Sequence, residues 1–422
     1  MPVSRLNEKN LLLGAWRATV AAADPRTLTA GRFPPAPAGR LCIIAAGKAA
    51  LPMADAALEH YSGRTDAVEG VIAAPGPLPD RVGPLSCIEA EHPVPDAGSF
   101  RAGAAAAELA GTLGPDDLLL CLVSGGASAL LNAPDGVSGE EVQNLYRQLL
   151  ASGLGITELN TVRRKLCRLK GGGLARLAAP ARVHALLLSD VVGDDPAVIG
   201  SGLSVDDPDG PEDALGILAG AGISSPGVER RLRELAADPP AAPPVHGDTH
   251  VLNGTEAGLG AAADSLRVAG LAAHVLADSV TGPSAEAARF HAAIAGRMLR
   301  RAEPFGPPAA LVSGGETTVQ LPAGSSGTGG PNSQFLLAFA LECWGTDRVH
   351  ALAADTDGLD GAGGAAGALL SPHLFQQARK ADAQVAFDGF DSGTFFRSHG
   401  HDLVSGPTGT NINDLRIILV NP

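Results

Sequence analysis

Lysine is scarce in this chain: of its 31 basic residues only five are lysine, Lys9, Lys48, Lys165, Lys170 and Lys380. Aromatic residues make up 4% of the sequence, and the net charge is −14. Such an acidic balance disfavours a nucleic-acid backbone or an anionic membrane surface as a partner. A lysine inside a glycine turn is therefore more informative here than it would be in a lysine-rich chain.

Cysteine and long apolar runs are also limited. The five cysteines are an odd number without a C-x-x-C pair, which indicates free thiols in a reducing compartment. Leu11–Leu13 is flanked by charged residues and is too short for a secretion signal. No uncharged apolar stretch reaches the ~20 residues of a membrane span. We therefore expect a soluble cytoplasmic protein with no membrane partner, compatible with a homodimer.

The 422 residues contain 54 glycines and 32 prolines, and strand-like runs alternate with Ala-rich helical stretches. The expected strands are Leu41–Ala46, Gly70–Ala74, Leu118–Val123, His184–Ser189, His250–Asn253, Ala273–Ala277, Ala309–Ser313, Val349–Ala354 and Leu415–Val420. Helices are expected over Ser99–Leu113, Glu140–Ala151, Thr255–Val268 and Ser284–Arg301. Most strand runs are unbroken rather than alternating, as in parallel strands covered on both faces, so the pattern predicts an α/β fold.

The best domain boundary is a proline-rich stretch. Four prolines lie between Ala236 and Val245, where they favour an extended, semi-stiff spacer over a helix. We expect one domain over residues 1–238 and a second over 245–422, with the last strand able to pack back on the first domain.

Two short segments are nearly alike: Leu122–Leu131 and Leu311–Val319 each contain Leu-Val-Ser-Gly-Gly. We expect each to be a strand followed by a tight turn, where ligands of open sheets bind and paired glycines admit a phosphate closely. The alternative is two unrelated turns. The candidate ligand-binding residues are Ser124, Gly125, Gly126, Ala127, Ser128, Ser313, Gly314, Gly315 and Glu316.

Gly47 and Lys48 follow the first expected strand and precede a helical stretch. The segment is not a P-loop, because Cys42 stands where its first glycine would be and Ala49 replaces the hydroxyl residue. A lysine before a helix N-terminus still favours an anion. We expect Lys48 to contact phosphate, the alternative being an ordinary surface lysine.

Carboxylates cluster after two expected strands. Asp190 and Asp194 follow one, and Asp355 and Asp360 follow another. Carboxylates beside glycines suit Mg²⁺ held together with substrate phosphates. Asx turns are the alternative for Asp357 and Asp360, and neither segment has the loop of an EF-hand.

Further polar candidates lie in two other segments. Residues 159–169 predict a basic helix with Lys170 in its last turn, where Arg163 or Lys170 would bind an acidic substrate or simply complement the helix dipole. Thr408, Asn411 and Asn413, in the loop before the last strand, could line a ligand or form a turn. His92 lies on a proline loop, and we assign it no catalytic role.

Together these motifs resemble one family, the class II glycerate 2-kinases of the MOFRL family, over about residues 40–416. The matching segments are Ala46-Gly-Lys-Ala49, His92-Pro-Val-Pro-Asp96, Val123-Ser-Gly-Gly-Ala-Ser128, Leu159-Asn-Thr-Val-Arg163, Lys170-Gly-Gly172, Ser189-Asp-Val-Val-Gly-Asp194, Ser313-Gly-Gly-Glu-Thr317, Thr356-Asp-Gly-Leu-Asp-Gly361 and Gly406-Pro-Thr-Gly-Thr-Asn-Ile-Asn-Asp414. The resemblance implies two three-layer α/β/α domains, the N-terminal one Rossmann-like, with the active site in the interdomain cleft. It also implies transfer of phosphate from ATP to the 2-hydroxyl of D-glycerate with Mg²⁺ or another divalent cation, giving 2-phosphoglycerate and ADP.

The roles of individual residues remain open at this point. Asp190 and Asp355 would hold the cation or accept the substrate's hydroxyl proton, and either lobe could hold the nucleotide. One segment departs from the family: many members have Gly-Gly-Arg-Asn-Gln-Glu where this chain has Pro331 and Gln334 and retains Asn332. An NAD(P)-dependent hydroxypyruvate reductase and a non-catalytic sugar-acid sensor are the alternative functions, although the dinucleotide fingerprint is missing.

Overall fold

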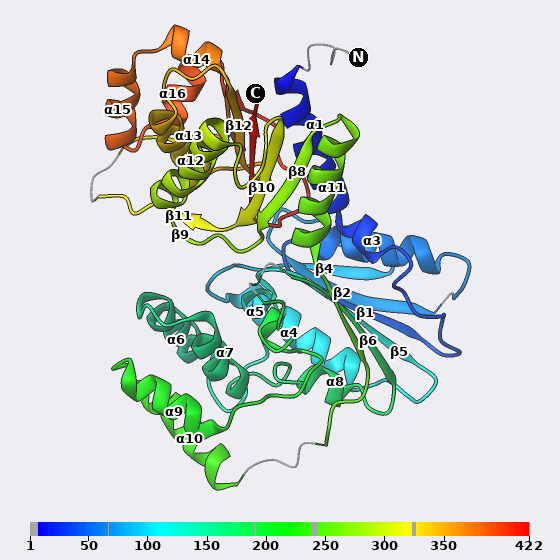
Figure 1. The fold of residues 1–422 in the computed structure, drawn as a ribbon. Helices are drawn as coiled ribbons and strands as arrows, with labels where there is room; N and C mark the ends of the chain where they lie inside the picture. The colour runs from blue at the N-terminus through cyan, green and yellow to red at the C-terminus, as the bar shows by residue number, and fades with distance from the viewer. Residues whose placement is uncertain are drawn as a thin grey trace. The chain divides into compact units, whose positions relative to one another are not determined.

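The structure, a computed structural model, describes residues 7–65, 67–189, 191, 193–238, 243–322 and 326–421. The chain forms two compact units. The first is Leu28–Asn253, and the second is Gly254–Pro422 together with the N-terminal residues through Thr27. Each unit has its own sheet with helices packed on it, so the predicted α/β class is confirmed (Figure 1).

The sheet of the first unit has seven strands in the order β3-β4-β2-β1-β5-β6-β7. Their bounds are β1 Leu41–Ala46, β2 Val68–Ala74, β3 Arg81–Val82, β4 Leu85–Glu89, β5 Leu118–Val123, β6 Arg182–Leu188 and β7 Asp248–Leu252. All neighbours are parallel except the two-residue β3. Without β3 the order is that of an open doubly wound sheet, whose topological switch point lies between β1 and β5.

Apolar side chains cover both faces of this sheet, because successive residues of a strand point to opposite faces. Ile43 packs with α3 on one face, and Ile44 packs with α4 and α8 on the other (Figure 1). Helices α6, α7, α9 and α10 share a separate apolar cluster. The helices are α2 Pro25–Thr29, α3 Ala50–Tyr61, α4 Ala97–Ala110, α5 Ala127–Leu130, α6 Gly139–Ala151, α7 Ile156–Lys165, α8 Gly173–Leu177, η1 Ile199–Ser201, α9 Pro211–Gly220 and α10 Pro226–Ala237.

The sheet of the second unit has six strands in the order β14-β13-β12-β15-β10-β8. Their bounds are β8 Ala272–Ala277, β10 Ala309–Gly315, β12 Val349–Asp355, β13 Gly367–Leu370, β14 Asp402–Leu403 and β15 Asp414–Val420, and a separate pair is β9 Gly282–Pro283 with β11 Thr317–Thr318. The expectation of parallel strands is wrong here, since β15 is antiparallel to both β10 and β12. An unbroken apolar strand signals two covered faces, not a direction.

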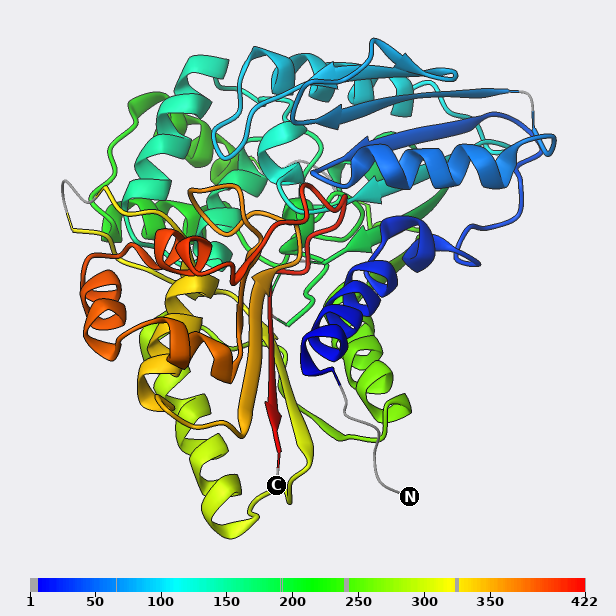
Figure 2. The same ribbon diagram turned by 90° about the horizontal axis from the view of Figure 1, so that it is seen from above.

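Helices also cover both faces of this second sheet. Apolar residues of α12 and α13 pack on one face, and those of α1 and α11 pack on the other. Figure 2 shows α1 and α11 side by side and the red β15 between its neighbours. The helices are α1 Glu8–Ala22, α11 Gly254–Val268, α12 Ser284–Arg301, α13 Pro331–Glu342, α14 Pro372–Gln377, α15 Lys380–Asp388 and α16 Ser392–Ser398.

The two units differ from the expected domains 1–238 and 245–422. The first unit continues beyond the proline-rich stretch because β7 pairs with β6. The N-terminal helix belongs to the second unit because α1 packs on α11, where Thr19 Oγ1 donates a hydrogen bond to the Gly258 carbonyl at 3.1 Å. The last strand lies inside the second unit's own sheet rather than on the first.

The nine expected strands are all present, with ends that differ from the prediction by two residues or fewer. All five cysteines are unpaired, and burial raises the pKa of the Cys42 and Cys121 thiols to about 12. None of the described helices combines the length and the hydrophobicity needed to cross a membrane.

Candidate functional site

The two glycine turns of the first unit lie together at the switch point between β1 and β5. Lys48 N–H donates to the Gly125 carbonyl, and Ala49 N–H donates to Ser124 Oγ, both at 2.9 Å. Any side chain at Gly47 would overlap Ser124. The predicted Gly47–Lys48 turn and the first Ser-Gly-Gly turn are thus one interlocked structure, with the Lys48 side chain exposed.

The rest of the first Ser-Gly-Gly segment continues into the one-turn helix α5. Gly126 adopts a left-handed φ of 87° at the N-cap, which glycine tolerates best. Ala127 then begins the helix, and Ser128 Oγ lies 2.8 Å from Ser201 Oγ in a hydrogen bond. Within the turn, Ala127 N–H donates to the Ser124 carbonyl at 3.2 Å and Ala129 N–H donates to the Gly126 carbonyl at 3.0 Å, so backbone hydrogen bonds fix the start of α5.

Arg163 and Lys170 are buried cations, with exposed fractions of 6% and 3%. Arg163 lies on α7, but the expectation that Lys170 occupies the last turn of that helix is wrong. The helix ends at Lys165, because Arg168 N–H donates to the Ala133 carbonyl at 2.9 Å instead of to a helical one. Lys170 therefore lies in the following loop.

Both cations contact the same tyrosine. Lys170 Nζ donates to Tyr146 Oη at 3.1 Å, and Arg163 Cζ lies 4.5 Å from the centre of the Tyr146 ring. Among the described residues no carboxylate forms an ion pair with either cation, whereas the neighbouring Arg164 and Lys165 both pair with Asp207. Burial lowers the pKa of the Arg163 guanidinium. A buried charge without a counter-ion is costly, and an incoming anion would relieve that cost.

His92 belongs to the same neighbourhood, although sequence reasoning assigned it no role. A side chain at Gly126 would come within 3.2 Å of the His92 ring. Partial burial, followed by the charges of Lys48 and Arg163, lowers the pKa of His92. The surroundings of His92 therefore favour the neutral form of its imidazole.

The predicted carboxylates after β6 give a mixed result. Asp190 lies outside the described residues. Asp194 adopts a left-handed φ of 53°, and its carboxylate accepts a hydrogen bond from Asn253 Nδ2 at 2.6 Å. Its predicted role as a metal ligand stays a prediction.

The second Ser-Gly-Gly segment is not a turn. Ser313, Gly314 and Gly315 are the last three residues of β10 and pair with β15, which corrects the expectation. A side chain at Gly315, where φ is 114°, would overlap the backbone of Val280. Ser313 Oγ lies 2.9 Å from His291 Nε2 in a buried hydrogen bond, while Glu316 is exposed just beyond the strand.

A buried ion pair that the sequence analysis missed lies next to this strand end. Arg416 is fully buried on β15 and pairs with Asp414. Asp414 also accepts hydrogen bonds from Thr317 N–H at 2.9 Å and from Asn332 Nδ2 at 2.6 Å. Two charged residues at the start of an otherwise apolar strand were the available signal. Unlike Arg163, Arg416 has its counter-charge inside the protein.

Asp355, at the end of β12, stands among other acids. Burial, followed by the charges of Asp357 and Asp414, raises the pKa of Asp355 to about 8, although Asp357 N–H donates to it at 3.0 Å. A hard divalent ion, which prefers carboxylate oxygens, would relieve this crowding. Within the described ranges, however, no three His, Cys, Asp or Glu side chains gather in a way that could hold a metal.

Asp360 has a structural role in this unit. Its carboxylate accepts hydrogen bonds from Asn332 N–H at 2.9 Å, Ser333 N–H at 2.8 Å and Ser333 Oγ at 2.6 Å, and so caps the N-terminus of α13. Its oxygens are already used, which disfavours the expected metal ligation.

The loop before β15 follows the turn alternative. Thr408 Oγ1 donates to the Thr356 carbonyl at 2.5 Å, and Asn411 Oδ1 accepts from Asn413 N–H at 2.9 Å. A side chain at Gly358 would overlap the Gly406 carbonyl. The loop is therefore held against the acidic loop after β12, and ligand binding by these residues stays a prediction.

Comparison with known proteins places this architecture in a family. A family model described as “Domain of unknown function (DUF4147)” matches residues 11–234, and one described as “MOFRL family” matches residues 309–414. The D-glycerate 2-kinase of Thermotoga maritima is 35% identical over 421 residues, 98% of each chain. The chain belongs to the MOFRL family.

Other similarities agree with this membership. A protein of Agrobacterium vitis named “Putative hydroxypyruvate reductase” is 38% identical, over 98% of this chain and 95% of that one. The crystal structure of a glycerate kinase from Thermotoga maritima superposes with a TM-score of 0.87 at 34% identity, covering 98% of this chain and 99% of that chain. The family thus includes proteins named for a kinase and proteins named for a reductase.

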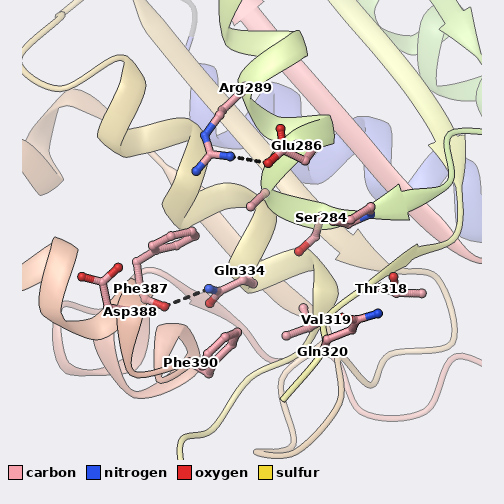
Figure 3. A pocket seen from close by; sticks show the side chains of 12 residues that line it. Ser284, Glu286, Arg289, Thr318, Val319, Gln320, Gln334, Phe387, Asp388 and Phe390 are labelled. Atoms are coloured by element: carbon pink, nitrogen blue, oxygen red, sulfur yellow. Dashed lines mark hydrogen bonds and ion pairs between the residues drawn. The ribbon is translucent and has the colours of Figure 1, made fainter. Parts of the chain in front are cut away.

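The departure from the MOFRL family motif lies at a cavity of the second unit. Pro331 is the first residue of α13, a position that suits proline. Gln334 is buried, and its Nε2 donates to the Phe387 carbonyl of α15 at 2.9 Å (Figure 3). The cavity beside it has a volume of about 330 Å³ and is also lined by Arg289, which pairs with Glu286. Gln334 thus joins two helices.

Proposed function

We propose that this MOFRL family member phosphorylates D-glycerate at the 2-hydroxyl, with ATP as donor and Mg²⁺ or another divalent cation as cofactor. The relatives named glycerate kinase support the reaction class. The structural observation that carries the proposal is the pair of buried cations, Arg163 and Lys170, which have no carboxylate partner among the described residues. Such a pair fits a small anionic substrate.

The first unit would supply the anion-binding groups. Arg163 and Lys170 would bind the substrate carboxylate. Lys48 and the amides around Gly126 would stabilise the transferred phosphoryl group, whose catalysis depends mainly on positioning and charge. Two observations support this role for Lys48: its side chain is exposed, and its backbone is fixed by the hydrogen bond to the Gly125 carbonyl in the turn after β5.

The carboxylates would handle the proton and the cation. Asp190 and Asp355 are proposed to accept the proton of the 2-hydroxyl or to hold the cation, and Asp194 is a further candidate ligand. Asp355 is supported by its acidic surroundings, which favour either a bound proton or a cation. When bound, Mg²⁺ would neutralise charge on the β- and γ-phosphates.

A hydroxypyruvate reductase is the second candidate, because a 38%-identical relative carries that name. In a doubly wound sheet the dinucleotide fingerprint follows the first strand. Here β1 is followed by Gly47, Lys48 and Ala49, with one glycine and a lysine instead of spaced glycines. The reductase is therefore the weaker candidate.

One assay distinguishes the candidates. Purified protein with ATP, Mg²⁺ and D-glycerate should form ADP and 2-phosphoglycerate, and a chelator should abolish turnover. The same protein with hydroxypyruvate and NADH or NADPH should leave the nicotinamide absorbance unchanged. Nicotinamide oxidation without ADP formation would overturn the kinase proposal, and glycerate binding without either reaction would favour a sensor.

A further inference from the structure

Tyr146 of α6 is the centre of a buried hydrogen-bond network in the first unit. Its side chain is 2% exposed. Its hydroxyl accepts hydrogen bonds from Lys170 Nζ and Asn132 Nδ2 and donates one to the Ser128 carbonyl, each at 3.1 Å. A phenol oxygen has one proton to donate and two lone pairs to accept with, so this hydroxyl is fully used.

The ring of Tyr146 holds a second cation. Arg163 Cζ lies 4.5 Å from the ring centre, within the range of a cation–π interaction. Within the described part of the chain, the guanidinium makes one long hydrogen bond, from Nη1 to Asn160 Oδ1 at 3.4 Å, and its buried Nε has no partner there. One neutral side chain thus contacts two buried cations.

A carboxylate in the place of Tyr146 would neutralise those cations, as Asp207 does for Arg164 and Lys165. A tyrosine orients them through its ring and hydroxyl and leaves their charge uncompensated. Because its hydroxyl also donates to Ser128, it ties the cations to the segment that follows the Gly126 turn.

We propose that Tyr146 is the positioning residue that presents Arg163 and Lys170 to the carboxylate of the substrate. This inference rests on the proposed function, in which those two cations bind glycerate. The planar guanidinium offers a fork of N–H donors and the ammonium a compact charge, which suits the two oxygens of a carboxylate. Tyr146 acts through both cations and does not itself touch the reacting atoms.

The test is Tyr146→Phe, with Tyr61→Phe as a matched control. These are the two tyrosines of the chain, and both are buried. Tyr61 Oη donates to the Pro34 carbonyl at 2.7 Å, so its variant also loses one buried hydrogen bond. Tyr146→Phe should raise KM for D-glycerate by roughly tenfold, the scale of a hydrogen bond to a charged group. The KM for ATP should stay within about twofold.

A purely structural role predicts a different pattern. Thermal unfolding of both variants measures the general cost of losing a buried hydroxyl. If Tyr61→Phe raises KM for glycerate as much as Tyr146→Phe, or if Tyr146→Phe changes only stability, the inference is overturned.

A double-mutant cycle with Lys170→Met provides a second measurement. If the Tyr146 hydroxyl acts through Lys170, Tyr146→Phe should add less than about twofold to KM in the Lys170→Met background. If Tyr146→Phe raises KM for D-glycerate by the same factor in the Lys170→Met protein as in wild type, the inference is overturned.

Calorimetric titration with D-glycerate separates this inference from the proposed function. Wild-type protein that neither binds glycerate nor forms 2-phosphoglycerate would contradict the proposed function. Wild type that binds glycerate, with Tyr146→Phe binding it equally well, would contradict only the role of Tyr146. Weaker binding by Tyr146→Phe with normal binding by Tyr61→Phe supports it.

Discussion

The same five residues, Leu-Val-Ser-Gly-Gly, occur in two different settings. In the first unit the glycines leave the strand and form a turn that interlocks with Lys48. The buried cations of that unit, Arg163 and Lys170, form no ion pair with a carboxylate of the described residues. In the second unit the glycines stay in β10 and pair with β15, and the nearby Arg416 is neutralised by Asp414. A shared motif therefore does not define a shared role.

The two settings differ in the sign of the charges that they contain. The first setting has positive charge to offer to an anion, through Lys48, Arg163 and Lys170. The second has carboxylates to offer to a proton or a cation, through Asp355 and its neighbours. Phosphoryl transfer needs both kinds of group.

The largest effect on stability should come from replacing one glycine of each Ser-Gly-Gly segment by alanine. Gly315→Ala places a methyl group on backbone atoms of Val280, so the main chain itself has to shift and a loss of at least about 3 kcal/mol is expected. Gly126→Ala meets the ring of His92 and the side chain of Leu130, both beyond 3.0 Å, together with a left-handed φ, so it should cost about 1 kcal/mol. Urea unfolding measures both. Equal losses would show that the two segments have the same surroundings.

Asp355→Asn should lower the activity of the protein while raising its stability at pH 8. We expect turnover to fall at least about 10²-fold, because an amide neither accepts the proton nor holds a cation as well. A carboxyl whose folded-state pKa is raised to about 8 stabilises the fold at low pH and loses that contribution as pH rises from about 4 to 8. The metal-free variant should therefore unfold at a higher temperature than wild type at pH 8, with a smaller gain at pH 5.

The matched control for that variant is Asp264→Asn on the exposed surface of α11. It should change neither turnover nor the pH dependence of unfolding, since exposed ion pairs contribute little. An Asp355→Asn variant that is less stable than wild type at pH 8 would contradict the crowded-carboxylate account.

Lys48→Ala tests the first setting without disturbing the fold. The side chain is exposed and its turn is held by backbone hydrogen bonds, so the unfolding temperature should not change. Loss of one charge-stabilising donor should lower kcat about 10²-fold. Lys380→Ala on α15 is the control. Near-normal turnover of Lys48→Ala would remove this lysine from the mechanism.

Local patterns predicted the elements better than their pairing. Unbroken apolar runs located all nine expected strands, because a strand whose two faces are both buried consists almost entirely of apolar residues. The antiparallel insertion of β15 between β10 and β12 depends on contacts distant in sequence, which no local pattern contains. Two further strands were missed because their apolar runs are short: β4 contains Ser86 and Glu89, and β13 has only four residues.

The candidate site shows the same limit. Arg163 and Lys170 could be proposed from their charge, but Tyr146 could not, because its spacing from Val142 and Leu149 is that of an ordinary helix core face. Asp360 resembled a metal ligand in the sequence, yet its partners are the first amides of α13, about 30 residues away by chain position. Chemistry-bearing residues can be proposed locally, whereas their partners require the fold.

The smallest effect is expected at Gln334, where this chain departs from the family motif. Because Gln334 Nε2 donates to the Phe387 carbonyl, Gln334→Glu would place an acceptor against an acceptor and should cost about 1–2 kcal/mol of stability. Turnover should stay within about twofold, since the bond joins α13 to α15. Gln320→Glu, an exposed residue of the same cavity, is the control for added charge. A Gln334→Glu variant with unchanged stability and altered KM for ATP or glycerate would instead make this cavity part of the substrate site. The second unit would then bind substrate as well as hold carboxylates, which would break the contrast between the two settings.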